Sequence, residues 1–280
     1  MTHYKRFTRR LQLGFGVATI LVVTLFPFYW MIVTSFKPNQ ELYSVEANPL
    51  FVVSPVWDHF VYLFTKTLFV DWMRNSAIVA VVATLFSLFA ATLAGYALAR
   101  LRFPGANVLG WAIFVTYLIP PTLLFLPLTQ LIFQIHMGNS LIGLIFVYPT
   151  FLIPFSTWLL IGYFRSIPID LEECAMIDGA TRMRAFLSVT LPLALPGLLS
   201  VGIFSFTLSW NEFLYALAFI SDPTIKTIPI GVTSELVRGD VFFWGELMAG
   251  ALLGSIPVAV IYSFFVDYFV AGLTAGAVKG

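Results

Sequence analysis

Long apolar runs, separated by shorter polar segments, dominate the pattern of this chain. Six of the runs approach the ~20 residues that an α-helix needs to cross a bilayer. A spanning helix also satisfies its own backbone hydrogen bonds, so the pattern predicts an all-α polytopic membrane protein with one transmembrane domain over residues 1–280. The predicted helices lie at about residues 12–35, 75–99, 108–128, 141–163, 198–220 and 247–271.

The first apolar run follows four basic residues, as in a signal peptide. Its length exceeds that of a signal peptide, and the TSFKPNQ segment after it lacks the small-residue cleavage pattern. We therefore expect a retained helix. Prolines in the third and fourth runs, at 120–121, 149 and 154, predict bends, which either shape a cavity or are tolerated kinks.

The second predicted helix carries a small residue at every fourth position. In lipid, such stripes let two backbones approach closely, so this one predicts a packing seam against another helix. The alternative is chance, since glycine and alanine are common in membrane helices. A shorter pair, Gly250 and Gly254, lies in the sixth helix. The members of the longer stripe are Ala83, Ser87, Ala91, Gly95 and Ala99.

Composition supports the bilayer as the solvent: 59% of residues are hydrophobic and 10% are charged, far from the balance of a soluble domain. The net charge of +1 argues against nucleic-acid binding. A single cysteine, Cys174, excludes an internal disulfide and a cysteine metal cluster. The three histidines are scattered along the chain and form no ligand pair, so no metal site is predicted.

Lysine and arginine in the connecting segments predict the orientation. With the N-terminus inside, ten basic residues fall in cytoplasmic segments and five in outer segments, which favours cytoplasmic termini. The cytoplasmic ones are Lys5, Arg6, Arg9, Arg10, Arg100, Arg102, Arg165, Arg182, Arg184 and Lys279, and the outer ones are Lys37, Lys66, Arg74, Lys226 and Arg238.

Residues 164–197 form the longest cytoplasmic connection and predict two short helices. Asp170 is expected to cap the first helix, with Glu173 completing a reciprocal capping arrangement. Gly179 supplies a left-handed stop. Thr181 is expected to cap the second helix, which ends before Pro192. The two helices form a knob with an apolar side made by Leu171, Cys174 and Ala175.

This connection resembles the E-A-A-x3-G-x9-I-x-L-P loop of bacterial ABC-importer permeases. The spacing match is full, with Cys174 in place of the usual alanine and Val189 in place of the usual isoleucine. YALARLRFPG, WNEFLYALAF and the terminal GLTAGAVKG extend the resemblance over nearly the whole chain and point to the maltose-type carbohydrate-uptake branch. The residues that match the loop are Glu173, Cys174, Ala175, Gly179, Val189, Leu191 and Pro192.

The resemblance implies a type I importer permease with the MetI-like fold in a bacterial cytoplasmic (inner) membrane. It also implies a second permease subunit, two ATPase subunits that bind ATP and magnesium, and an extracytoplasmic solute-binding protein. The tail, residues 272–280, would reach the ATPase dimer interface; the alternative is a frayed terminus. The residues to which the resemblance gives an ATPase-coupling role are Glu172, Glu173, Ala175, Asp178, Gly179, Arg182, Leu191 and Pro192.

The chain shows no catalytic pattern of its own. Lys66-Thr67 and Lys226-Thr227 are the candidate ends of a phosphate-binding loop, and neither follows a glycine. GxSxG and HExxH patterns are also absent, so an intramembrane enzyme has no visible nucleophile or metal. The chain is therefore expected to bind no cofactor and to leave ATP hydrolysis to a separate subunit.

Few charged residues fall within the predicted helices, and each is a functional candidate. Trp210, Asn211 and Glu212 combine an aromatic ring with hydrogen-bonding groups, as a sugar or polyol pathway requires. Alternatively, Glu212 ties two helices together. Glu246 is expected at the outer interface, and Asp267 in a structural role. The lack of a midplane charge disfavours the alternative function, an ion-coupled secondary carrier.

Overall fold

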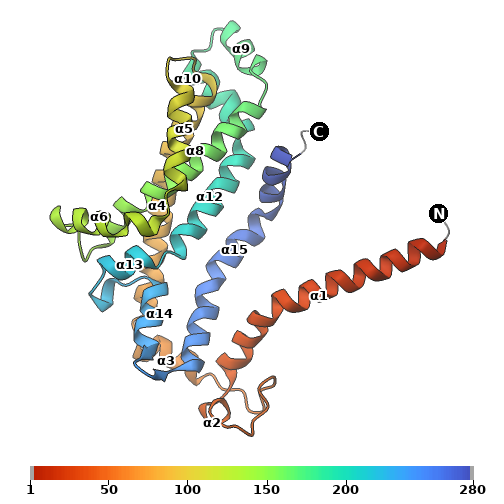
Figure 1. The fold of residues 1–280 in the computed structure, drawn as a ribbon, viewed down its shortest axis with the longest axis vertical. Helices are drawn as coiled ribbons and strands as arrows, with labels where there is room; N and C mark the ends of the chain where they lie inside the picture. Colours follow the sequence, from red (N-terminus) through yellow and green to blue (C-terminus); the bar gives the residue numbers. More distant parts are fainter. Residues whose placement is uncertain (1–2, 278–280) are drawn as a thin grey trace. The chain divides into compact units, whose positions relative to one another are not determined.

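The computed structural model describes the backbone of residues 3–277 and the side chains of residues 10–266. Helices dominate the described chain (Figure 1). The long helices are α1 (His3–Phe36), α4 (Phe69–Arg100), α8 (Pro149–Ser166), α12 (Leu195–Trp210) and α15 (Trp244–Ala277). The shorter elements are α2 (Asn39–Leu42), α3 (Asp58–Lys66), α5 (Ala106–Leu118), α6 (Pro121–Gln134), α7 (Leu141–Val147), α9 (Asp170–Ile177), α10 (Arg182–Ala185), a π turn η1 (Phe186–Thr190), α11 (Leu191–Leu193), α13 (Leu214–Phe219), a 3-10 turn η2 (Pro223–Ile225), α14 (Ile228–Leu236), β1 (Val237–Arg238) and β2 (Val241–Phe242).

Backbone contacts divide the chain into two compact units. The first unit holds residues 1–69 and 232–256, and the second holds residues 70–231 and 257–280. The prediction of one domain over residues 1–280 stays a prediction.

Within the first unit, polar groups of buried side chains are paired. The Lys37 amine donates to the carbonyl oxygens of Asn48 at 2.6 Å and Pro49 at 3.3 Å. His59, which is also buried, places Nδ1 3.1 Å from a carboxylate oxygen of Glu246. Strands β1 and β2 form an antiparallel hairpin in which Val237 pairs with Phe242.

The second unit is a helical bundle in which α8 lies between α5 and α12 (Figure 1). Two apolar clusters form its core. One cluster joins α4 to α7, α8 and α13, and includes Val79, Leu144 and Tyr215. The other joins α4 to α8, α12 and the π turn, and includes Tyr96, Leu160 and Phe186.

The predicted membrane helices are present, but two of them are interrupted. Within the described residues, four helices are long and apolar enough to cross a membrane, and six are if each of two bent helix pairs counts as one span. The third predicted helix bends by 92° between α5 and α6. Pro120 and Pro121 lie at this bend, lack backbone N–H donors, and disfavour helical geometry in the residue before them.

The fifth predicted helix, 198–220, is wrong as a continuous element. Helix α12 ends at Trp210 and α13 begins at Leu214, with Asn211–Phe213 between them. The sixth extends further than predicted, because α15 runs on to Ala277 and so includes the first residues of the predicted tail. Residues 278–280 and the side chain of Asp267 lie outside the described part of the structure.

Candidate functional site

Helix α9 begins one position earlier than a cap at Asp170 would require. Ile169, the residue before the helix, already has helical dihedral angles and makes no side-chain capping bond. The predicted capping roles of Asp170 and Glu173 are therefore wrong. The acidic residues of the first turn, Asp170, Glu172 and Glu173, still lie at the positive end of the helix dipole.

Gly179 ends α9 as predicted. Its φ of +92° is left-handed, a conformation that a side chain disfavours. The Gly179 amide donates to the Met176 carbonyl at 3.1 Å, and the Ala180 amide donates to the Ala175 carbonyl at 3.0 Å. These bonds use carbonyl groups that the helix end leaves free, so the chain reverses sharply between α9 and α10.

Thr181 caps α10, also as predicted: its hydroxyl accepts the Arg184 amide at 3.3 Å. The predicted end of the second helix before Pro192 is wrong. Helix α10 continues through the π turn into α11, which contains Pro192 at its start. Pro192 has no backbone N–H, so the hydrogen bond that a residue would donate at this position of a helix is absent.

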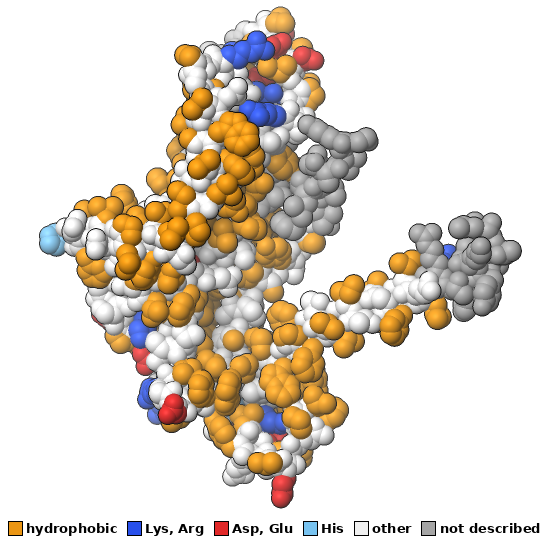
Figure 2. Space-filling model, in the orientation of Figure 1, with side chains coloured by type: hydrophobic (Ala, Val, Ile, Leu, Met, Phe, Trp, Pro, Cys, Tyr) orange, Lys and Arg blue, Asp and Glu red, His pale blue; other side chains and the backbone are white. Residues whose placement is uncertain are grey.

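The knob formed by α9, α10 and the π turn exposes apolar side chains at the end of the second unit. Ile177 is 84% exposed and Met183 is 59% exposed, while Leu171 and Cys174 are also exposed. Figure 2 shows basic and acidic side chains beside hydrophobic ones at this end. Exposed apolar clusters of this kind mark protein interaction sites. The other predicted coupling residues divide into exposed Glu173, Asp178, Gly179, Arg182 and Pro192 and half-buried Ala175 and Leu191.

Glu172 differs from the rest of the predicted coupling residues because it is buried, at 3% exposure. The Tyr96 hydroxyl donates to its Oε1, and the Thr190 hydroxyl donates to its Oε2 at 3.0 Å. Arg100 Nε lies 3.5 Å from Oε2, an ion-pair distance without hydrogen-bond geometry. Arg100 also donates to the Ile167 carbonyl at 2.7 Å. We call Tyr96, Arg100, Glu172 and Thr190 the Glu172 cluster.

The Glu172 cluster attaches α9 to two other elements, the end of α4 and the π turn. Aromatic packing surrounds it, with the Tyr96 ring 4.3 Å from Phe186 and 5.9 Å from Phe164. Sequence reasoning missed Tyr96, Arg100 and Thr190 as partners of this loop. The available signal was the YALARLRFPG segment, which places a tyrosine and an arginine one helical turn apart at the end of a span.

The predicted pathway residues have three different environments. The Trp210 side chain is buried and its ring stacks on Phe206 at 5.5 Å. Asn211 is exposed at the break between α12 and α13, and its amide donates to the Thr207 carbonyl at 2.9 Å. The Glu212 carboxylate accepts bonds from the Tyr148 hydroxyl at 2.8 Å and the Tyr215 amide at 2.8 Å.

Glu212 therefore satisfies the first free amides of α13, since it also accepts the Ala216 amide at 3.1 Å. Its bond to the fully buried Tyr148 joins this break to the start of α8. These hydrogen bonds give Glu212 a structural role at the break between α12 and α13. This agrees with the alternative from the sequence, in which Glu212 ties two helices together. A solute contact by this residue stays a prediction.

The small-residue stripe of α4 lies in the interior of the second unit. A Cβ atom on Gly95 would lie 3.0 Å from the Cβ of Leu160 on α8. Ala83 and Ala91 belong to the two core clusters, and Ala99 packs against the second of them. Ser87 is fully buried as well.

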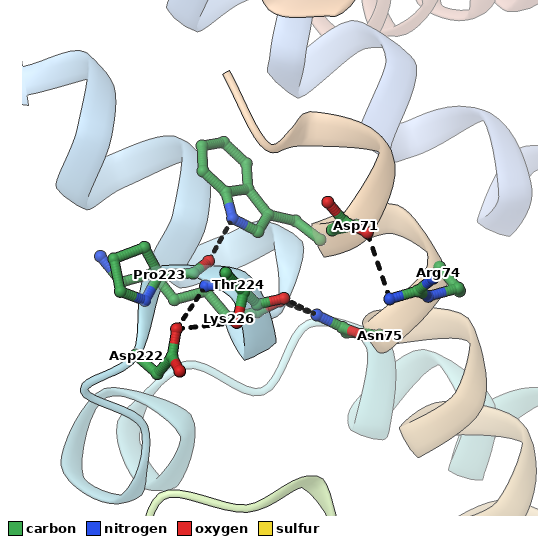
Figure 3. A network of polar contacts seen from close by, with 8 residues as sticks. Asp71, Arg74, Asn75, Asp222, Pro223, Thr224 and Lys226 are labelled. Atoms are coloured by element: carbon green, nitrogen blue, oxygen red, sulfur yellow. Dashed lines mark hydrogen bonds and ion pairs between the residues drawn. The ribbon is translucent and has the colours of Figure 1, made fainter.

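The opposite end of α4 carries a second polar network (Figure 3). Trp72 Nε1 donates to the Pro223 carbonyl at 2.9 Å, and the Asn75 amide donates to the carbonyls of Thr224 at 2.9 Å and Lys226 at 3.0 Å. Asp222 accepts from the Thr224 amide and hydroxyl, and these bonds lower the pKa of its carboxyl. The segment between α13 and α14 is thereby fixed to the start of α4.

Within the described residues, no group of three or more His, Cys, Asp or Glu side chains could hold a metal ion.

Comparison with known proteins gives one family and full-length relatives. Residues 88–275 match the family described as "Binding-protein-dependent transport system inner membrane component". The chain is 35% identical to the inner membrane ABC transporter permease protein YcjP of Escherichia coli K12, with 100% of each chain covered. It is 34% identical to the trehalose/maltose transport system permease protein MalG of Thermococcus litoralis, covering 97% of this chain and 98% of that one. A chain of a bacterial ABC transporter that imports the acidic polysaccharide alginate has the same fold, with a TM-score of 0.83, 18% identity, and 96% and 99% coverage.

Proposed function

The chain belongs to the family of binding-protein-dependent transport system inner membrane components, and we propose that it carries a sugar, an oligosaccharide or a related polyol into a bacterial cell as one permease subunit of an ATP-driven importer. The observation that carries this proposal is the family match over residues 88–275, together with full-length relatives named as permeases of ABC transporters. Members of this family are membrane channels rather than enzymes, so the chain is an inner-membrane transport protein. The alternative of an ion-coupled secondary carrier has no support from these relatives.

We propose further that the knob around α9 docks into a separate ATPase subunit that binds ATP and magnesium. Two features support this. Its exposed apolar residues, Ile177, Met183 and Leu171, need a protein surface to cover them in water. The knob is attached to α4 through the hydrogen bonds of buried Glu172. A displacement of α9 is therefore transmitted to α4. The remaining predicted coupling residues keep this role as part of the proposal.

The complete importer in this proposal contains a second permease subunit, two ATPase subunits and an extracytoplasmic solute-binding protein, with both termini of this chain in the cytoplasm. The predicted tail contact with the ATPase also stays a proposal. Asn211 is the pathway residue whose environment best fits a solute contact, because it is exposed at a helix break that Glu212 holds in place. Trp210 is buried next to Asn211 in the sequence, so its proposed role is to pack beneath Asn211 and not to contact the solute.

The test is transport by the purified complex in proteoliposomes, with the binding protein and a panel of labelled sugars and polyols. We expect uptake that needs internal ATP and the binding protein. In Gly179→Asp the Cβ meets nothing within 4 Å, but the side chain strains the left-handed turn, where φ is +92°. Because this strain is local to the exposed knob, we expect the variant to assemble but to lose most coupled ATPase activity. Uptake driven by a proton or sodium gradient without ATP would overturn the proposal, as would wild-type coupling by Gly179→Asp.

A further inference from the structure

A groove opens where α4 and α8 end and α5 begins, all within the second unit. A cavity of ≈ 560 Å³ lies beneath the connection between α4 and α5, and a cavity of ≈ 100 Å³ continues from it along α5 and α8. The two cavities are parts of one groove, which we call the α5 groove, because they share four lining residues. These are Leu98, Ala106, Asn107 and Arg165.

The mouth of the α5 groove is positively charged. It is lined by Arg100, Arg102 and Arg165, and no Asp or Glu lines either cavity. Arg100 is already neutralised by Glu172. Arg102 and Arg165 are both exposed and form no ion pair within the part of the chain whose side chains are described. An adjoining cavity shares Arg100, Leu101, Arg102 and Ile169 with the first and is also lined by Glu172, Glu173 and Arg182. With that cavity included, four arginines face two glutamates, so the opening keeps a net positive charge.

The deeper part of the α5 groove is apolar and aromatic. The rings of Trp111 and Trp158 lie 6.1 Å apart and form part of its wall. Gly110 leaves it open, since a Cβ there would meet nothing within 4 Å. At 1.5 Å per helical residue, Trp111 lies about 8 Å along α5 from Ala106, and Trp158 about 10 Å along α8 from Arg165. Tryptophan at this depth is typical of a membrane interface.

We propose that the α5 groove binds an anionic phospholipid. Arg102 and Arg165 hold its phosphate, and an acyl chain lies along Gly110, Trp111 and Trp158. A free phosphate ion would contact the arginines but would leave the apolar part of the groove empty. A zwitterionic lipid would place its ammonium group near two arginines, which repel it. Basic pockets between membrane helices bind anionic headgroups in this way. The proposal goes beyond the transport function and does not depend on which leaflet of the membrane the groove faces.

The test is native mass spectrometry of the assembled complex in detergent. Phosphatidylglycerol, phosphatidylcholine with the same acyl chains, and inorganic phosphate are the probes. We expect the wild type to retain phosphatidylglycerol in preference to phosphatidylcholine, and excess inorganic phosphate not to displace it. The double variant Arg102→Gln with Arg165→Gln should bind it about thirtyfold more weakly. Arg184→Gln, a basic residue on the same end of the unit but outside the groove, should bind like the wild type.

A second pair of variants tests the acyl-chain contact without changing charge. Gly110→Leu fills the open groove and should also weaken retention of the lipid, whereas Gly162→Leu, on α8 with equally open surroundings, should not. Equal retention of both lipids, displacement by inorganic phosphate, or full binding by either groove variant would overturn the proposal. A wild-type complex that retains no phosphatidylglycerol would overturn it too.

Discussion

Glu172 and Glu173 are neighbours on α9 with opposite surroundings. Glu172 is buried against Tyr96, Arg100 and Thr190, whereas the Glu173 side chain is exposed. The matched loop pattern assigns the coupling glutamate to position 173. Glu172 instead attaches the loop to the membrane helices. We therefore expect removal of Glu172 to lower stability and removal of Glu173 to lower coupled ATPase activity.

Glu172→Ala should destabilise the protein much more than Glu173→Ala. Removing the carboxylate leaves the Arg100 guanidinium buried without its counter-charge, which typically costs about 3–5 kcal/mol. Glu173→Ala should change the free energy of unfolding by less than about 0.5 kcal/mol, as exposed substitutions usually do, while still lowering coupled ATPase activity. Thermal unfolding in detergent and ATPase assays measure the two effects. Equal melting temperatures for the two variants would contradict the buried role of Glu172.

Acceptor groups surround His59 in the first unit and favour its imidazolium form. Its Nε2 lies 2.8 Å from the Lys37 carbonyl oxygen and its Nδ1 3.1 Å from Glu246, so both ring nitrogens face acceptors. Burial lowers the pKa of His59, but the Glu246 carboxylate, the Lys37 carbonyl and nearby Asp58 together raise it above its ordinary value. Protonation therefore stabilises this part of the fold.

The stability of the first unit should fall as pH rises through the folded-state pKa of His59. Because this pKa is raised, the contribution is complete below about 6.5, the unfolded value, and is lost at higher pH. Hydrogen exchange of α3 amides across pH 6 to 9 measures it. In Glu246→Gln the same pH dependence should shrink; an unchanged dependence in this variant would rule out His59 as the group responsible.

At the scale of the element, α4 is fixed at both of its ends. Its start binds the segment before α14 through Trp72 and Asn75, and its end binds α9 through Tyr96 and Arg100. At 1.5 Å per helical residue, Asn75 and Tyr96 are about 32 Å apart along this helix. A helix held in this manner connects the segment between α13 and α14 to the proposed coupling knob.

Close packing along the middle of α4 should be sensitive to volume. Gly95→Leu places a side chain where the Cβ alone would approach Leu160 to 3.0 Å, and overpacking of this kind typically costs about 1–3 kcal/mol. The matched control is Gly162→Leu on α8, where a Cβ meets nothing within 4 Å. The measurement is thermal unfolding in detergent. If both variants melt at the wild-type temperature, the stripe is not a packing seam.

Apolar length and backbone chemistry made most elements predictable from the sequence. The run of residues 75–99 could only be a spanning helix, and Gly179 and Thr181 act locally, as helix stop and cap. The break at Asn211–Phe213 was missed, because it depends on Glu212 meeting Tyr148, a contact between residues distant in sequence. The Glu172 cluster was missed for the same reason.

At the scale of the whole molecule, the knob around α9 is expected to be covered only in the assembled importer. Its most exposed apolar residue is Ile177, with 84% of its surface open in this chain. Burying such a side chain fully contributes about 1.5–3 kcal/mol to association. The same face carries Glu173 and Arg182, which can add polar contacts at the rim.

A photoactivatable crosslinker attached at Ile177→Cys should therefore capture the ATPase subunit. The background carries Cys174→Ser, because the native cysteine is also exposed on α9. Arg74→Cys is the matched control: the Arg74 side chain is also exposed but lies near the start of α4, at the other end of that helix from the Glu172 cluster. Mass spectrometry identifies the captured chain. Crosslinks to the ATPase from both positions, or lipid adducts alone from Ile177→Cys, would contradict a knob that docks on the ATPase, because the proposal requires α9 to be the covered surface and the start of α4 to lie away from it.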